Sequence, residues 1–220
     1  MGAEDPTTTA VRRGLESGNA SVRLRAALAV GTSPDAGLVD SLVERCAVEP
    51  DGYVRDMLTW ALTRLPPAVT VPRLVEQLRS TRAQARSQAL HTLSKIGDRR
   101  AWPAIGPALL TDADDEVARS AWRAAVVLVP EDQKPELAAV LATQLGRGGR
   151  ETQLSLSRAL IALDEASTPV LTAAGSARDL GRRQHAIATE RLRRDPDAGF
   201  EYAIEQAKRA VALGTMTAEG

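Results

Sequence analysis

Four stretches of the sequence repeat one pattern: SVRLRAALAVG at 21–31, YVRDMLTWAL at 53–62, QARSQALHTLSKIGD at 84–98 and DEVARSAWRAA at 115–125. Within each stretch, apolar or small residues recur at i, i+4, i+7 and i+8, which is the stripe of an amphipathic helix. A fifth copy begins near residue 152, and a weaker sixth covers 182–192. The anchor positions of the first five copies are Arg23, Arg55, Arg86, Ala118 and Gln153. Their separations of 32, 31, 32 and 35 residues indicate an internal repeat.

A second set of apolar-periodic stretches lies between these helices. It covers residues 8–16, 35–46, 69–78, 101–110, 135–145 and 169–173. Helix-breaking residues such as Pro34, Pro66 and Pro130 separate the two sets. Two helices in each repeat form a hairpin. Because one hairpin cannot bury both of its apolar faces, each copy must stack on the next.

The four quoted stretches resemble the second helix of HEAT repeats, and the short period is similar to that of the HEAT-like repeats of phycobilin lyases. The resemblance implies an all-α fold, a right-handed α-solenoid of about six helical hairpins. In this family the anchor arginine pairs with carboxylates or carbonyls of the neighbouring repeat. Ala118 and Gln153 depart from that pattern, so the arginine ladder should weaken in the second half of the chain.

The domain organisation follows from the extent of the repeats. We expect a disordered N-terminus at residues 1–7, the solenoid at 8–195, a C-terminal capping helix at 196–213 and a disordered tail at 214–220. The capping helix carries a stripe of Phe200, Ile204, Ala207 and Val211. This stripe would cover the open apolar face of the last hairpin.

The composition gives little indication of the partner. Lysine plus arginine and aspartate plus glutamate each number 28, so the net charge gives no bulk reason to expect nucleic acid or an anionic membrane. The basic residues are almost all arginine and alanine is abundant, a bias that we interpret as bacterial. The single cysteine and the absence of a signal-peptide pattern predict a cytoplasmic protein.

The second helices of HEAT arrays line the concave side, so the repeat frame predicts which residues face a partner. With Val54 at the centre of the buried stripe, steps of 100° per residue place one set of side chains away from the core. The predicted partner-binding residues are Asp56, Thr59, Trp60, His91, Arg119, Trp122, Arg123 and Arg158. Tryptophan and arginine are the residue types that most often anchor interfaces. The alternative is that Trp60 and Trp122 only fill space between adjacent helices.

No catalytic or metal-binding pattern stands out, so the sequence favours a non-catalytic protein without a cofactor or metal. The two histidines, His91 and His185, and one cysteine cannot complete a zinc site alone. Cys46 could be a nucleophile or a chromophore attachment point, but a packed small residue is the simpler interpretation. The loop at residues 146–150 has the glycines of a phosphate cradle without its strand or Lys-Ser/Thr ending, so we interpret it as a flexible inter-helix loop.

These observations leave three functions open. The favoured one is a protein–protein interaction scaffold or adaptor that holds a partner peptide or helix in the concave groove. The second is nucleic-acid binding, as a regulatory accessory or a DNA-glycosylase-like protein, with Trp60, Trp122, Asp56 and Arg123 as candidate contacts. The third is a lyase-like tailoring role, which repeat type alone suggests.

Overall fold

The computed structural model describes residues 6–198 and 200–216, and within these ranges the chain contains helices and turns but no strand. The predicted all-α class is therefore confirmed. The chain divides into two compact units, residues 1–109 and 110–220. We describe each unit by itself.

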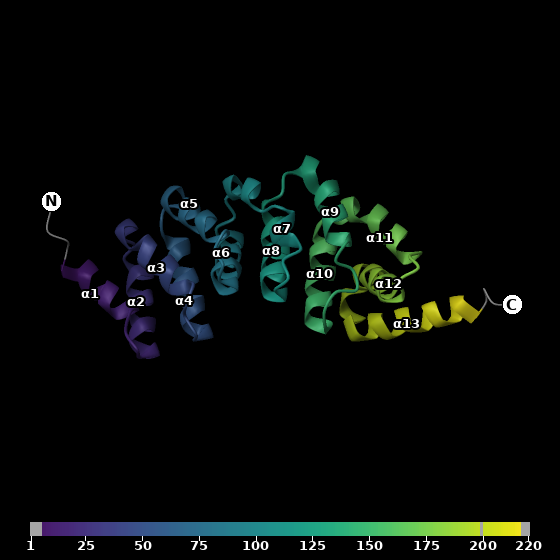
Figure 1. Cartoon of the computed structure of the whole chain (residues 1–220), viewed down its shortest axis with the longest axis horizontal. Helices are drawn as coiled ribbons and strands as arrows, with labels where there is room; N and C mark the ends of the chain where they lie inside the picture. The colour runs from purple at the N-terminus through teal and green to yellow at the C-terminus, as the bar shows by residue number, and fades with distance from the viewer. Residues whose placement is uncertain (1–5, 199, 217–220) are drawn as a thin grey trace. The chain divides into compact units, whose positions relative to one another are not determined.

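Unit 1 is a stack of helical hairpins in two layers (Figure 1). The layer of first helices contains α1 (Pro6–Leu15), α3 (Val39–Cys46) and α5 (Pro67–Gln77). The layer of second helices contains α2 (Ala20–Thr32), α4 (Gly52–Arg64) and α6 (Ala83–Ile96). Helix α4 packs against both α2 and α6, besides its own hairpin partner α3. Short 3-10 helices, η1 (Ala36–Leu38) and η2 (Arg99–Ala104), follow α2 and α6.

Unit 2 repeats this arrangement. Its second helices are α8 (Asp115–Leu128), α10 (Arg150–Ala162) and α12 (Leu180–Arg194), and α10 packs against both of the others. Its first helices are α9 (Lys134–Ala142) and α11 (Thr168–Gly175), each preceded by a 3-10 turn, η3 (Glu131–Gln133) and η4 (Asp164–Ser167). After η5 (Pro196–Ala198), α13 (Phe200–Met216) packs against α12.

Several element boundaries differ from the sequence-based expectation. The first helix expected at 101–110 is broken into η2 and a single turn, α7 (Pro107–Leu110), because Pro103 and Pro107 interrupt the backbone hydrogen bonds of a continuous helix. Residues 6–7 belong to α1 and residues 214–216 to α13, although both were expected to be disordered. The other residues expected to be disordered, 1–5 and 217–220, lie outside the described residues.

Four second helices, α2, α4, α8 and α12, begin at a side-chain cap, whereas α6 and α10 do not. The carboxylate of Asp51 accepts a hydrogen bond from the Val54 N–H at 3.0 Å, and Asp179 accepts from the Arg182 N–H at 2.7 Å. Asp114 caps α8 by accepting from the N–H groups of Glu116 and Val117. Such caps satisfy N–H groups that have no partner inside the helix, and each contributes about 1 kcal/mol.

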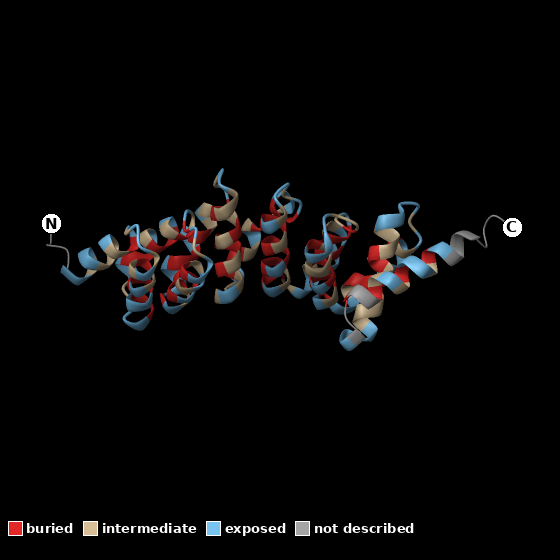
Figure 2. Cartoon of the chain, turned by 90° about the horizontal axis from the view of Figure 1, so that it is seen from below, coloured by how far each residue is buried: buried red, intermediate tan, exposed pale blue. Residues whose placement is uncertain are grey.

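The core of each unit lies between its two helical layers, where buried residues form bands along the second helices (Figure 2). In α8 the buried arc is wide: Val117, Ala118, Ala121, Ala124, Ala125 and Leu128 all have no exposed surface. Small alanines allow neighbouring helices to approach closely. The arc is wider than one stripe because second helices contact one another as well as their hairpin partners.

The anchor arginines hold the turn that precedes each second helix. Arg23 donates to the Ser17 carbonyl at 2.9 Å, Arg55 to the Glu49 carbonyl at 2.9 Å, and Arg86 to the Ser80 carbonyl at 2.9 Å. In every case the acceptor lies six residues before the arginine. The repeated arginine therefore satisfies a carbonyl that the turn leaves outside helical hydrogen bonding.

Arg23 makes a second interaction that ties neighbouring repeats together. Its Nε and Nη2 each donate to the buried carboxylate of Glu49 at 2.6 Å, and Arg45 Nε lies 3.0 Å from the same carboxylate. Burial raises the pKa of Glu49, but the hydrogen bonds from Arg23 and the Asp51 N–H, with the charge of Arg45, outweigh it and hold that pKa below its ordinary value. Glu49 is therefore an ionised residue with no exposed surface.

Unit 2 holds the turns before α8 and α10 without an anchor arginine, whereas Arg183 of α12 donates to the Ala177 carbonyl at 2.8 Å, again six residues before the arginine. Where Ala118 occupies the anchor position, Arg147 of the 146–150 loop donates to the Asp112 and Ala113 carbonyls and lies 2.8 Å from the Asp115 carboxylate. Gln153 donates to the Gly148 carbonyl at 3.2 Å. The turn before α8 is thus still held by an arginine, Arg147, which comes from the loop after α9 and not from the second helix itself. The 146–150 loop, which was expected to be flexible, is anchored through this residue.

Candidate functional site

The outward face of unit 1 carries two exposed aromatic side chains on α4. Tyr53, Asp56 and Trp60 follow one another at i, i+3 and i+7, which places them on one face of the helix. Tyr53 is 65% exposed and Trp60 is 37% exposed. Sequence reasoning selected Asp56 and Trp60 but missed Tyr53, which precedes the repeat's anchor by two residues.

Trp60 lies directly on Gly31 of α2. A Cβ atom placed on Gly31 would lie 2.0 Å from Cζ3 of the indole, so no other residue fits at that position beneath the ring as it stands. A glycine inside a helix costs about 1 kcal/mol relative to alanine. Here it makes room for one side of a half-exposed tryptophan.

The same face continues onto the two neighbouring second helices of unit 1. Leu28 of α2 and His91 of α6 occupy the repeat position of Trp60, five residues after their anchors. Leu28 is 38% exposed and His91 is half-buried. The outward face of unit 1, defined by Leu28, Tyr53, Asp56, Trp60 and His91, therefore combines apolar and polar side chains.

Thr59 does not belong to this face, so the expectation that it points to solvent is wrong. It is 5% exposed, and its hydroxyl lies 3.4 Å from that of Thr92 on α6. Position 59 comes four residues after the anchor. At that angle the side chain points toward the adjacent second helix instead of outward.

Trp122 of unit 2 is the second correction. It occupies the same position in its repeat as Thr59, has no exposed surface, and donates from Nε1 to the Leu110 carbonyl at 2.8 Å. Trp122 was expected to face solvent because the prediction assumed that each second helix is buried along one stripe only. The contact between α8 and α10 widens that stripe to include this position.

The three predicted arginines of unit 2 have different surroundings. Arg119 is half-buried, with its guanidinium 3.5 Å from Glu116 and 3.6 Å from Glu151. Arg123 is exposed and donates to the Ser120 hydroxyl at 2.9 Å, with Glu116 3.4 Å away. Arg158 is exposed on α10 and lines a hollow beside α12 and α13.

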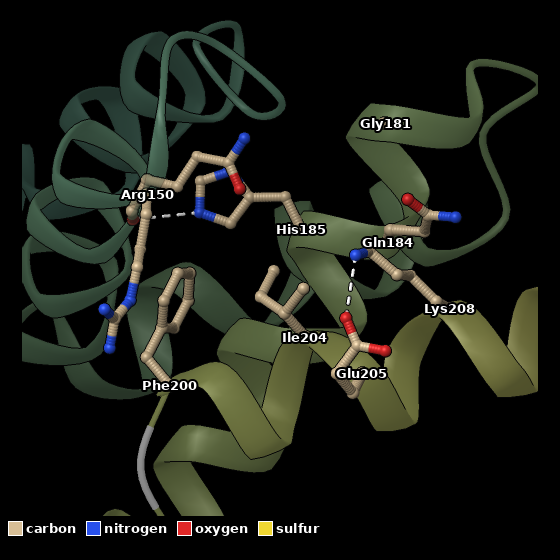
Figure 3. Close-up of a pocket in the computed structure, with 9 residues that line it drawn as sticks. Arg150, Gly181, Gln184, His185, Phe200, Ile204, Glu205 and Lys208 are labelled. Atoms are coloured by element: carbon tan, nitrogen blue, oxygen red, sulfur yellow. Dashed lines mark hydrogen bonds and ion pairs between the residues drawn. The ribbon is translucent and has the colours of Figure 1, made fainter.

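That hollow, which we name the Arg158 hollow, has a volume of about 460 Å³. It is lined by Arg150, Leu154, Arg158, Ile161, Ala162, Leu192, Arg193, Pro196 and Phe200. A second, larger hollow of about 600 Å³ shares Arg150 and Phe200 with it. This His185 hollow is lined by Arg150, Gln153, Gly181, Gln184, His185, Phe200, Ile204, Glu205 and Lys208 (Figure 3). Sequence reasoning missed both, because they depend on how α13 lies against α10 and α12.

His185 points from α12 toward α10 at the wall of the larger hollow (Figure 3). The Gly146 N–H donates to Nδ1 at 3.0 Å, so the proton of the neutral ring is on Nε2. Nε2 lies 3.0 Å from the Gln153 carbonyl, which can only accept. Burial lowers the pKa of His185 to about 4, although the hydrogen bond with Gln153 opposes this shift.

Ser157 lies 3.0 Å from His185 Nε2, which raises the question of a serine–histidine nucleophile. The hydrogen bonds answer it. Thr189 donates its hydroxyl proton to the His185 carbonyl at 2.9 Å, so Ser157 donates to Thr189 Oγ1 at 2.8 Å. Because Nε2 already carries a proton, His185 cannot accept one from Ser157. The group is a buried network that fixes the 146–150 loop to α10 and α12.

Cys46 is also unsuited to chemistry as it stands. It is 4% exposed, and burial, reinforced by the charge of Glu49, raises its pKa to about 12. The described residues contain no group of three His, Cys, Asp or Glu side chains placed to hold a metal ion. Among the same residues, no helix combines the length and the apolar character needed to cross a membrane.

Comparisons with known proteins give a family match for part of the chain. Residues 39–126 match the family model for HEAT repeats. No curated protein matches the sequence.

Two similar solved structures illustrate the comparison. The complex of CpcE and CpcF of phycocyanin lyase from Nostoc sp. PCC7120 is 21% identical, with a TM-score of 0.49 over 86% of this chain and 79% of that chain. Human deoxyhypusine hydroxylase in complex with glycerol is 18% identical, with a TM-score of 0.47 over 91% of this chain and 94% of that chain.

Proposed function

Because the chain contains HEAT repeats, we propose that it is a protein-interaction module that binds a segment of another protein on the outward face of unit 1. The observation that carries this proposal is the half-exposed Trp60 seated on Gly31. Tryptophan is the residue type most enriched among the side chains that dominate binding energies.

The packing of Trp60 favours binding in a second way. The indole is held against the α2 backbone at Gly31. The Trp60 side chain is therefore already fixed in the free protein, and a partner that covers its other side restricts it little further. Binding then loses less side-chain entropy, which for a freely rotating side chain costs about 0.5–1.5 kcal/mol. A fixed aromatic surface beside Leu28 is a suitable anchor for an apolar side chain of the partner.

The rest of the face supplies a polar rim. Asp56 lies one helical turn before Trp60 on α4, and His91 occupies the equivalent position of Trp60 on the neighbouring helix α6. The Tyr53 hydroxyl belongs to an exposed ring. An apolar centre with polar edges is the arrangement found in many protein interfaces. Binding by this face involves no catalytic group.

The nucleic-acid alternative has less support. It placed Trp60, Trp122, Asp56 and Arg123 together, but Trp122 is buried and Arg123 is engaged with Ser120 and Glu116. Base stacking requires exposed aromatic rings, and burial removes Trp122 from that set. The tailoring alternative is weakened in the same way, since its candidate attachment point, Cys46, is buried.

The test is affinity purification from nuclease-treated lysate with wild type, Trp60→Ala and Trp60→Phe. Val69→Ala serves as the matched control, because Val69 is 41% exposed and lies on α5 in the other layer. We expect the same protein partner with wild type and Val69→Ala, reduced recovery with Trp60→Phe and none with Trp60→Ala. Equal recovery by all variants, or loss of every partner on nuclease treatment, contradicts the proposal.

A further inference from the structure

The two adjoining hollows of unit 2 form a groove whose chemistry differs from the outward face of unit 1. Both lie along α10, α12 and α13, and they share Arg150 and Phe200. Phe200 is 5% exposed and packs edge-on against His185, with ring centroids 6.1 Å apart. It therefore separates the two hollows as a fixed partition.

The floor of the groove is apolar and incompletely covered. Leu154, Leu192 and Ile204 are half-buried and pack against a buried cluster of Ala188, Phe200, Ala203 and Ala207. Ile161 adds a further half-buried side chain to the Arg158 hollow. Each hollow can thus accept an apolar side chain and complete the burial of the residues beneath it.

The charged residues of the groove are predominantly cationic. The described lining residues include Arg150, Arg158, Arg193 and Lys208 and, among the same residues, one carboxylate, Glu205. Glu205 lies 2.8 Å from Lys208, so it offsets that lysine (Figure 3). Arg193 is held by the Ser167 and Thr168 hydroxyls, and its guanidinium lies 3.3 Å from the Glu190 carboxylate, which offsets its charge. Among the described residues that line the Arg158 hollow there is no carboxylate, although the whole chain has no net charge.

We propose that this groove binds an acidic amphipathic segment of a partner protein, with one apolar side chain in each hollow and carboxylates paired with Arg150 and Arg158. Charge complementarity determines the occupant: arginine binds carboxylates through its planar guanidinium, and the apolar floor requires apolar anchors between them. Nucleic acid fits less well, because none of the described residues that line either hollow offers an exposed aromatic ring for base stacking.

The proposal shares the kind of partner with the proposed function but uses different residues. Trp60→Ala should therefore leave binding at this groove unchanged. Conversely, substitutions at Arg150 and Arg158 should leave the outward face of unit 1 intact. The two proposals can fail separately.

The experiment is selection of a displayed library of random helical peptides on the full chain, run in parallel on wild type, Arg150→Gln/Arg158→Gln and Arg150→Glu/Arg158→Glu. The matched control is Arg79→Gln, an exposed arginine of unit 1. Circular dichroism of each variant establishes that it is folded. We expect wild type and Arg79→Gln to enrich peptides with aspartate or glutamate beside two apolar anchors.

The variants then separate the outcomes. For an enriched peptide, we expect the double glutamine variant to lower affinity about tenfold or more, as loss of two charge-assisted contacts implies. The double glutamate variant should enrich lysine- and arginine-bearing peptides instead. The proposal is overturned by no enrichment over the double glutamine variant, by uncharged or basic peptides on wild type, or by an oligonucleotide that displaces the selected peptides at physiological salt.

Discussion

Trp60 in unit 1 and Trp122 in unit 2 occupy neighbouring positions of the same repeat frame, yet one is 37% exposed and the other has no exposed surface. Trp60 comes five residues after its anchor and Trp122 four. One residue corresponds to a rotation of about 100° around a helix. That rotation separates a side chain on the outward face from one between helices. The comparison shows that a repeat identifies equivalent positions reliably. It also shows that two adjacent positions of one helix can differ completely in burial, one on the outward face and the next in the core.

The largest difference should appear when each tryptophan is removed. We expect Trp122→Ala to lower the free energy of unfolding by about 3–5 kcal/mol, because it leaves a cavity and an unpaired Leu110 carbonyl. Trp60→Ala should cost less, about 1–2 kcal/mol, because only the side of the ring that lies on Gly31 loses its contacts. Urea unfolding followed by circular dichroism measures both. Equal losses for the two variants would contradict the assignment of Trp122 to the core and Trp60 to the surface.

The next difference concerns acid. The ordinary pKa of a histidine is 6.5, and that of His185 in the folded chain is about 4. As pH falls below 6.5, the unfolded chain takes up the proton first, so stability should decrease until about pH 4 and then level off. By linkage the loss is about 3 kcal/mol at most. In His185→Gln, the unfolding free energy should lose this pH dependence between pH 6.5 and 4. If the unfolding free energies of wild type and His185→Gln, plotted against pH, run parallel over this range, the prediction is refuted.

Glu49 makes unit 1 respond in a different range. Its pKa is below the ordinary value of 4.5, so its contribution to stability is present above that pH and is lost as pH falls through the lower, folded-state pKa. Glu49→Gln should therefore change the pH dependence of unfolding only below pH 4.5, at and beyond the acid end of the range in which His185 acts. Measurement of both variants over the same pH series separates the two groups.

A smaller effect is expected at the seat of Trp60. Gly31→Ala places a methyl group where the indole lies, so the ring must move, at a cost of about 1–3 kcal/mol. In the background of Trp60→Ala the same change should instead stabilise the protein by up to about 1 kcal/mol, because nothing remains to clash and alanine favours the helix more than glycine does. A double-mutant cycle in urea gives the coupling energy. Additive effects would show that Trp60 is not held on Gly31.

The smallest expected effect compares the two ways of holding a turn. Arg86→Gln removes hydrogen bonds to two carbonyls of its own loop, whereas Arg147→Gln also removes the ion pair with Asp115. We expect losses of about 1 kcal/mol for Arg86→Gln and somewhat more for Arg147→Gln. Urea midpoints of the two variants test this order. A neutral Arg147→Gln would mean that the unit 2 turn does not need the substitute arginine.

Much of the fold could be predicted from the sequence, because the 32-residue spacing and the apolar stripe are local properties of each helix. The second helices were found in this way. The break in the helix expected at 101–110 was missed, because the apolar periodicity of that stretch does not register the effect of Pro103 and Pro107. Arg147 was missed because its acceptors, Asp112 and Ala113, are distant in sequence.

The candidate site was harder to predict. The exposed positions of Asp56 and Trp60 follow from helix geometry, whereas the burial of Thr59 and Trp122 depends on the contacts of second helices with one another. The hollows beside Arg158 depend on the path of α13, which no periodicity specifies. The positions of side chains around a single helix do not reveal how α13 packs against α10 and α12.

The central claim is that the outward face of unit 1 binds a protein through Trp60. The most direct measurement places the photocrosslinker p-benzoylphenylalanine at position 53, on the same face of α4 as Trp60, and, separately, at position 69, and irradiates both proteins in nuclease-treated lysate. Our account predicts a discrete protein adduct from position 53 that excess wild-type protein suppresses and that Trp60→Ala abolishes, and none from position 69. No adduct at position 53, an adduct that persists with Trp60→Ala, or the same adduct from both positions would contradict it.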